Sequence, residues 1–252
     1  MADLIAVRMV DDLAALARAA AEEFAHAAEE AVRARGRFTV ALSGGSTPRS
    51  LHRLLATAYR DRIDWRAVHV FWGDDRHVPP DHPESNFRMA RETLLDAVPV
   101  PPENIYRILA ENPDAARAAM DYEETLRAAF GLARGELPRF DLLVMGIGED
   151  GHTASLFPGS DALHECERLV VAPWVEKLRT FRITLTPPVL NHGANVLFLV
   201  SGEEKAEAVR TALEGERDPD RCPAQIVRPE SGSLLWLVDR AAASRLDSKP
   251  EE

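Results

Sequence analysis

Cysteine is scarce in this 252-residue chain, which contains only Cys166 and Cys222. The two lack the paired spacing of a zinc site or of a redox dithiol, and such sparse cysteine suits a reducing compartment. Long apolar runs are also missing, and the N-terminus has no basic segment followed by an apolar stretch. We therefore expect a cytoplasmic protein that does not associate with membranes.

Positive charge is in short supply as well. The chain has 41 acidic against 30 basic residues, giving a formal net charge of −11, and only three of the basic residues are lysines. Nucleic-acid surfaces need dense Lys and Arg, so a nucleic-acid partner is excluded. A small phosphorylated ligand remains possible, provided that one pocket concentrates cations and backbone amides.

Glycine and proline are scattered along the chain rather than gathered in a linker, and no fixed-period repeat is visible. One domain is common for α/β chains of this length. We expect residues 1–246 to form a single α/β domain and residues 247–252 to form a frayed, disordered tail.

Short apolar runs alternate with helical segments along most of the chain. Near-continuous apolar strands in such an alternation predict a three-layer, mostly parallel Rossmann-like sheet with helices on both faces. Helical stretches are also expected between and after the last three strands. The predicted strands are 4–9, 38–42, 68–72, 105–108, 142–145, 182–186, 195–200 and 234–238. The predicted helices run from Asp11 or Asp12 to Arg35, from near Pro48, through 89–95 and over 115–132.

The loop Ser43-Gly44-Gly45-Ser46-Thr47 lies between a predicted strand and a predicted helix N-terminus. Free N–H groups and the helix dipole favour an anion at such a place. The loop lacks the Gly-Lys-Ser/Thr ending of a nucleotide-binding loop, so a sugar phosphate fits better than a triphosphate. A tight turn with Ser46 or Thr47 as a simple helix cap is the alternative.

A second loop, residues 73–86, carries more charge than a connection needs. Arg76 could hold a phosphate through two hydrogen bonds, and Asp74 or Asp75 could orient Arg76 or bind a hydroxyl. Ser85-Asn86 reads as the cap of the next helix. The two histidines of this loop are interpreted as solvent-facing, because no third ligand at useful spacing supports a metal.

The run 140–160, FDLLVMGIGEDGHTASLFPGS, sends a buried strand into a turn of three glycines that presents Asp150 and His152. The glycines match a dinucleotide fingerprint, yet Pro158-Gly159 would break the helix which that motif requires. No acidic residue ends the following apolar segment, so a nicotinamide cofactor is disfavoured.

His152 can take a proton from water near neutral pH, which makes it a candidate general base at the carboxyl end of a strand. Asp150 would orient its ring or stabilise the turn, and Gly148 would lie against the substrate. A structural histidine is the alternative reading. Lys177 or Arg182 would complete a cationic pocket, while Arg179 reads as an ordinary exposed charge.

Five segments resemble the 6-phosphogluconolactonases in sequence, order and spacing. They are Leu42–Pro48, Trp72–Pro80 with Ser85-Asn86, Gly146–Pro158, Arg182–Thr186 and Ser201–Ala206, with Lys205 in the last. The resemblance implies the fold of glucosamine-6-phosphate deaminases and ribose-5-phosphate isomerases. It also implies hydrolysis of 6-phospho-D-glucono-1,5-lactone in the oxidative pentose phosphate pathway, with no metal or organic cofactor, by a chain that we expect to be a monomer.

Asp75 departs from the family pattern, which usually has Glu before the arginine, and its shorter arm could alter how Arg76 is held. The deaminases are the nearest rival. They resemble this chain in the glycine loop and the His152 turn, but their mechanism needs a carboxylate where this chain has Phe157, and they have a tyrosine at the position of Arg76. A non-catalytic sugar-phosphate sensor is a third possibility, against which the intact His152 turn argues.

Overall fold

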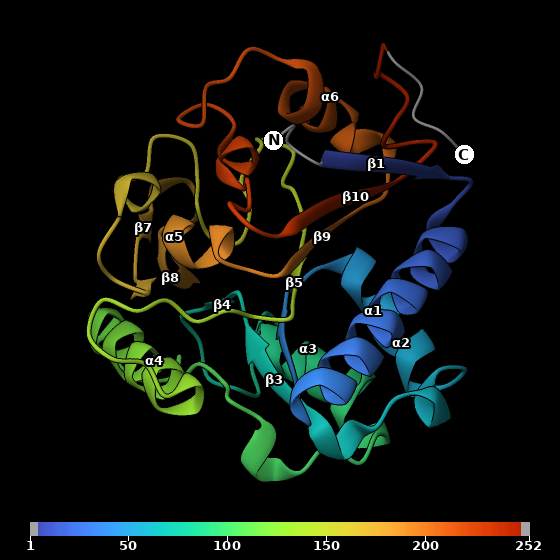
Figure 1. The fold of residues 1–252 in the computed structure, drawn as a ribbon. Coiled ribbons are helices and arrows are strands. Elements are labelled where there is room, and N and C mark those ends of the chain that lie inside the picture. Colours follow the sequence, from blue (N-terminus) through green and yellow to red (C-terminus); the bar gives the residue numbers. More distant parts are fainter. Residues whose placement is uncertain (1–4, 248–252) are drawn as a thin grey trace.

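The computed structural model describes residues 5–247, so the predicted tail lies outside the described residues except for Asp247. Its centre is a six-stranded sheet in which every neighbouring pair of strands is parallel (Figure 1). In spatial order the strands are β1 (Ile5–Val10), β10 (Ser233–Asp239), β9 (Asn195–Val200), β5 (Leu142–Met145), β2 (Phe38–Leu42) and β3 (Val68–Trp72). All residues of β2 and β5 are buried, which explains why their sequences are apolar except at Thr39.

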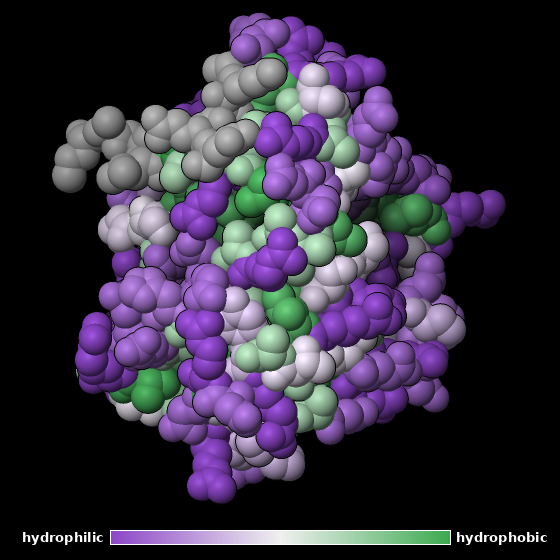
Figure 2. Space-filling view, turned by 90° about the vertical axis from the view of Figure 1, so that its right-hand side faces the viewer, coloured by the Kyte–Doolittle hydropathy of each residue, from purple (hydrophilic) through white to green (hydrophobic). Residues whose placement is uncertain are grey.

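Helices lie on both sides of this sheet, as predicted. α1 (Leu13–Arg35) begins at Asp12, whose side chain accepts the Ala15 N–H, and ends at Gly36 in the left-handed conformation. Figure 1 shows α1 and α2 (Ser46–Ala56) on one side and α4 (Ala115–Phe130) on the other. On the α1 side, Figure 2 shows hydrophilic residues around a central band of neutral and hydrophobic ones. The remaining α-helices described are α3 (Asn86–Thr93), α5 (Pro187–Asn191) and α6 (Ala206–Glu214).

A second, antiparallel sheet corrects the prediction that residues 182–186 belong to the parallel sheet. Its strands are β4 (Asp74–Arg76), β8 (Thr180–Leu185) and β6 (Val170–Val171), and β7 (Trp174–Val175) also pairs with β8. One of the three partners of β8 is therefore β4, the Asp-Asp-Arg segment of the loop predicted over residues 73–86. Backbone pairing, rather than apolar pattern, therefore makes β4 a strand.

Two further expectations are wrong. Residues 105–108 do not form a strand, because Ile105 makes only an isolated bridge to Val70 on the edge strand β3. After β10 the described chain continues in turns rather than in the expected helix. No described helix is long and apolar enough to span a membrane.

The carboxyl ends of β2, β3, β5 and β9 lead directly into residues 43, 73, 146 and 201. In a parallel sheet these ends meet at one edge, where ligands bind. Beneath this edge the Phe198 ring on β9 stacks on Trp236 of β10, with centroids 4.0 Å apart and planes at 1°. Both rings are buried.

We predict that Trp236→Ala lowers the free energy of unfolding by about 3–5 kcal/mol, because it leaves a cavity next to Phe198. Denaturant unfolding measures the loss. Trp174→Ala is the matched control, since Trp174 is 48% exposed. The assignment of Trp236 to the core would be wrong if both variants lost the same free energy.

Candidate active site

A cavity of about 380 Å³ lies at this edge of the sheet. Its wall comes from the loops after β2, β3, β5 and β9 together with β4 and β8. Every predicted site residue except Asp150 lines it: Ser43, Gly44, Gly45, Ser46, Asp74, Arg76, Gly148, His152, Lys177 and Arg182. Segments that are far apart in the sequence therefore form one site.

The Ser43–Ser46 loop ends at α2 with an uncapped N-terminus. Gly45 occupies the N-cap position with φ 111°, and no side chain accepts a hydrogen bond there. The alternative of a Ser46 or Thr47 cap is thus wrong, since the structure begins the helix at Ser46 itself. Ser43 Oγ is buried and has no hydrogen-bond partner among the described residues. Free donors at a helix N-terminus favour an anion.

Two arginines stand side by side across the antiparallel pair, because Arg76 on β4 is in register with Arg182 on β8. Arg182 Nε and Nη1 are buried and unpartnered in the described chain. Burial, and then the charge of Arg76, lower the pKa of the Arg182 guanidinium. Arg76 donates to the Glu84 carbonyl. Two neighbouring cations, with unused buried donors on Arg182, can bind an anion, which would offset their repulsion and supply a partner for those donors.

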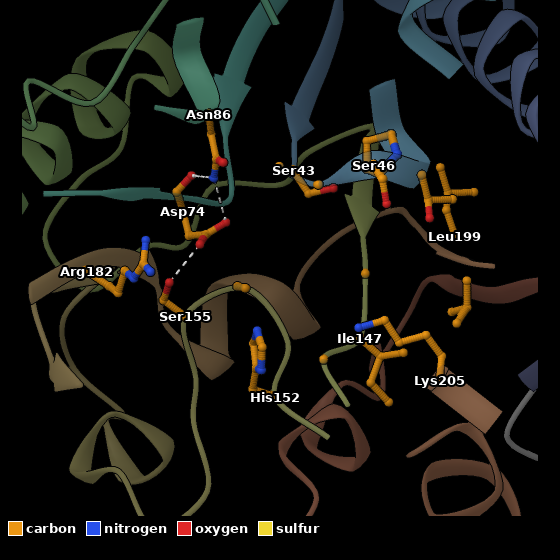
Figure 3. Close-up of a pocket in the computed structure, with 18 of the residues that line it drawn as sticks. Ser43, Ser46, Asp74, Asn86, Ile147, His152, Ser155, Arg182, Leu199 and Lys205 are labelled. Carbon is orange, nitrogen blue, oxygen red and sulfur yellow. Dashed lines mark hydrogen bonds between the residues drawn. The ribbon is translucent and has the colours of Figure 1, made fainter. Parts of the chain in front are cut away.

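Asp74 faces the same cavity and is buried. Its Oδ2 accepts a hydrogen bond from Ser155 Oγ at 2.7 Å, and its carbonyl accepts one from Asn86 Nδ2 at 2.9 Å (Figure 3). Sequence reasoning missed both partners. Ser155 lies inside the recognised turn motif, which was the available signal, and Asn86 was read as part of a cap.

Asp75 points away from the Arg76 guanidinium. Its carboxylate accepts the N–H groups of Arg76, Asn86 and Phe87 at 2.7–3.1 Å, and so it ties β4 to the start of α3. Burial raises the pKa of Asp75 to about 6, although these hydrogen bonds act to lower it. The Asp75 side chain, which is shorter than the Glu usual in the family, therefore contacts the backbone N–H of Arg76. Ser85 is the N-cap of α3 as predicted, with Oγ accepting the Arg88 N–H at 3.1 Å.

His152 is held against the glycine turn by Asp150, with Nδ1 2.5 Å from Oδ1. A Cβ at Gly148 would lie 2.0 Å from Nδ1, so only glycine allows this approach. Gly151 adopts φ 80°, which closes the turn. The Phe157 ring stacks on the imidazole at 4.3 Å. Figure 3 shows His152 between the Asp74–Arg182 side of the cavity and the Lys205 side.

Lys177 also approaches Asp150. Its ammonium forms an ion pair with the carboxylate and lies 4.7 Å from the centroid of the Phe157 ring. Burial alone would raise the pKa of Asp150, but hydrogen bonds from His152 and Lys177 outweigh it and hold the pKa well below its usual range. Asp150 therefore stays ionised beside His152. Phosphate binding by Lys177 remains a prediction.

The family model described as "Glucosamine-6-phosphate isomerases/6-phosphogluconolactonase" matches residues 11–236. The chain belongs to this family. A 6-phosphogluconolactonase of Nostoc sp. is 41% identical over 218 residues, covering 86% of this chain and 88% of that protein. The solved structure of the 6-phosphogluconolactonase from Trypanosoma cruzi is 27% identical, with a TM-score of 0.85 and coverage of 98% of this chain and 99% of that one.

A solved monomeric glucosamine-6-phosphate deaminase is 22% identical, with a TM-score of 0.79 and coverage of 95% of this chain and 99% of that one. At this identity the likeness shows the fold alone. It confirms the predicted deaminase-type α/β fold of the glucosamine-6-phosphate isomerase/6-phosphogluconolactonase family. Within that shared fold, the choice of reaction depends on the residues around His152.

Of two other basic residues, Lys205 and Arg179, only the first lines the cavity. Lys205 lines it, with Nζ 3.9 Å from a Glu149 carboxylate oxygen. Arg179 is exposed, as predicted, and does not line the cavity. Within residues 5–247, no group of three or more His, Cys, Asp or Glu side chains could hold a metal ion.

We predict that Arg182→Met stabilises the empty protein by about 1 kcal/mol, because it removes buried unpaired donors and a like-charged neighbour of Arg76. The same variant should bind inorganic phosphate at least tenfold more weakly. Denaturant unfolding and calorimetric titration measure the two effects. Arg33→Met, at a side chain that is 72% exposed, should change neither. An Arg182→Met protein with unchanged phosphate affinity would contradict the anion site.

Proposed function

We propose that this protein hydrolyses 6-phospho-D-glucono-1,5-lactone to 6-phospho-D-gluconate, the second step of the oxidative pentose phosphate pathway. The observation that carries the proposal is His152, which Asp150 holds in place and which lines a cavity whose other walls hold Arg76, Arg182 and the α2 N-terminus. The relatives named above support it. This arrangement provides a base for water and a binding site for a phosphate within one small volume.

His152 acts as the general base in this proposal. A carboxylate only accepts hydrogen bonds, so Asp150 holds the proton of the neutral imidazole on Nδ1 and leaves Nε2 free to accept. Nε2 takes a proton from water while the water oxygen attacks the lactone carbonyl carbon. The ring C–O bond then breaks, and the imidazolium returns the proton to the departing ring oxygen. Water and lactone thus give the acid without another reactant.

Arg76, Arg182 and the Ser43–Ser46 amides bind the phosphate, and Asp74 accepts a hydrogen bond from a sugar hydroxyl. This division follows the charges in the cavity, since the paired guanidinium groups need an anion, whereas Asp74 would repel one. We also propose that the protein acts in the cytoplasm as a monomer of one domain.

Deaminase chemistry is disfavoured by Phe157. The resemblance gives the deaminases a carboxylate at this position, but here the phenyl ring stacks on His152 and leaves Asp150 as the carboxylate that contacts the imidazole. We expect the protein to release no ammonia from glucosamine 6-phosphate above the blank. Measurable release would favour the rival reaction.

The lactone also hydrolyses without enzyme, so the assay must measure the rate above this background. General-base assistance contributes about 10²- to 10⁴-fold, and we predict that His152→Ala lowers kcat by that factor. Asp150→Asn should lower kcat too, because an amide can donate to Nδ1 and allow the wrong tautomer. A His152→Ala rate equal to wild type would refute the assignment.

We further predict that Gly148→Ala lowers kcat/KM at least a hundredfold, because its methyl group would displace the imidazole from Asp150. Gly73→Ala is the control. Apart from the two adjacent residues, the nearest atom to a Cβ there would be the Leu42 carbonyl oxygen at 3.7 Å, an ordinary contact, and Gly73 does not line the cavity. Equal losses in the two variants would mean that the close approach at Gly148 is unimportant.

A further inference from the structure

Asn86 lies where the arginine-bearing strand β4 meets the Ser43–Ser46 loop, and it is only 2% exposed. Its Nδ2 donates to the Asp74 carbonyl at 2.9 Å and approaches Asp74 Oδ1 at 3.4 Å (Figure 3). Both of these oxygens are acceptors. The orientation of the carboxamide is therefore fixed, with nitrogen toward Asp74 and Oδ1 directed away from it.

The backbone of Asn86 is held as firmly as its side chain. Its N–H donates to Asp75 Oδ1 at 2.7 Å, so two consecutive carboxylic residues of β4 hold one asparagine. Asp75 also accepts the next N–H along α3, that of Phe87. Asn86 thus moves with β4, which carries Arg76.

Gly44 faces the other side of the carboxamide. A Cβ at Gly44 would lie 1.8 Å from Asn86 Oδ1 and 2.5 Å from Cγ, much closer than non-bonded atoms approach. Gly44 does not have a positive φ, so the constraint is space rather than backbone conformation. The Asn86 side chain therefore occupies the volume that any larger residue at position 44 would need.

Asn86 Oδ1 meets no hydrogen-bond donor among the described residues, although it is buried. An unpaired buried acceptor destabilises a protein, so hydrogen bonding alone does not explain an amide at this position. What the amide oxygen does contact is the Gly44 backbone. This contact fixes how far the Ser43–Ser46 loop lies from Arg76 and Arg182.

We propose that Asn86 is a positioning residue for phosphate binding. Its carboxamide, anchored by Asp74, sets the position of Gly44 and hence of the Ser43–Ser46 amides relative to Arg76 and Arg182. The inference rests on the proposed function for the identity of the anion as the phosphate of a sugar. Asn86 acts through the loop and does not need to touch the substrate.

Calorimetric titration with 6-phosphogluconate and with inorganic phosphate tests the inference without requiring turnover. Asn86→Ala should weaken both affinities about tenfold, and in the lactone assay it should raise KM by a similar factor while kcat changes less than threefold. Asn104→Ala is the matched control, because Asn104 makes a surface hydrogen bond to the Arg66 carbonyl. Unchanged phosphate affinity in a folded Asn86→Ala protein would overturn the inference.

The pair Gly44 and Asn86 gives a sharper test, which also holds if Asn86→Ala alone does not fold. Gly44→Ala should weaken 6-phosphogluconate binding more than tenfold, because its methyl group and the carboxamide cannot occupy the same space. Adding Asn86→Ala should then restore part of that affinity, since the methyl group can take the vacated volume. A double variant that binds no more tightly than Gly44→Ala would overturn the inference.

These outcomes are separable from a failure of the proposed function. A wild-type protein that binds 6-phosphogluconate but does not hydrolyse the lactone contradicts the proposed reaction, and the Gly44–Asn86 comparison still decides the role of Asn86. If the wild-type protein hydrolyses the lactone and the Asn86→Ala variant binds phosphate as tightly as wild type, only the role of Asn86 is contradicted.

Discussion

The backbone pairing of β4 with β8 places two arginines opposite each other, and the rest of the site is arranged around the repulsion between their charges. Arg76 and Arg182 are in register, and the buried Nε and Nη1 of Arg182 have no partner in the described chain. Like charges and unpaired buried donors both destabilise the protein. The backbone must therefore hold them together, and it does so through a small sheet that lies outside the main parallel one.

That small sheet is anchored on both sides. Asp75 accepts three backbone N–H groups, those of Arg76 and of the first two residues of α3, while Asp74 is held by Ser155 from the His152 turn. The arginine strand is thus connected to a helix and to the turn that carries the base. Because each anchor is buried, a displacement of β4 would be transmitted to both ends of the cavity.

The sequence predicts the parts of this structure that depend on local pattern. The bounds of β2, β3, β5 and β9 agree with their apolar runs, because these strands are largely buried and each is followed by glycine or serine. β4 could not be found in this way, since Asp74, Asp75 and Arg76 form a strand only because β8 lies beside them. The apolar run 105–108 failed for the opposite reason: its pattern suits a strand, but just one of its residues bridges to the edge strand.

The candidate site shows the same division. Ser43–Ser46, Arg76 and His152 could be predicted because each follows a strand in a glycine-containing loop, and a parallel sheet brings such strand ends together. Asn86 and Ser155 could not be assigned from sequence, since their roles come from contacts with Asp74, which is 12 residues away from one and 81 from the other. Gly148 and Gly44 explain the difference. Both are visible in the sequence as turn glycines, yet what each one leaves room for, an imidazole or a carboxamide, is set by tertiary packing.

Asp150 connects His152 to Lys177, another cation of the cavity. It accepts from His152 Nδ1 and pairs with Lys177, and both partners also contact the Phe157 ring. A carboxylate kept ionised by two donors fixes the imidazole tautomer, while the ring limits how far imidazole and ammonium can move. The aromatic residue that separates this chain from the deaminase pattern therefore has a positive role. It restricts the imidazole that would act as the base in the proposed water activation.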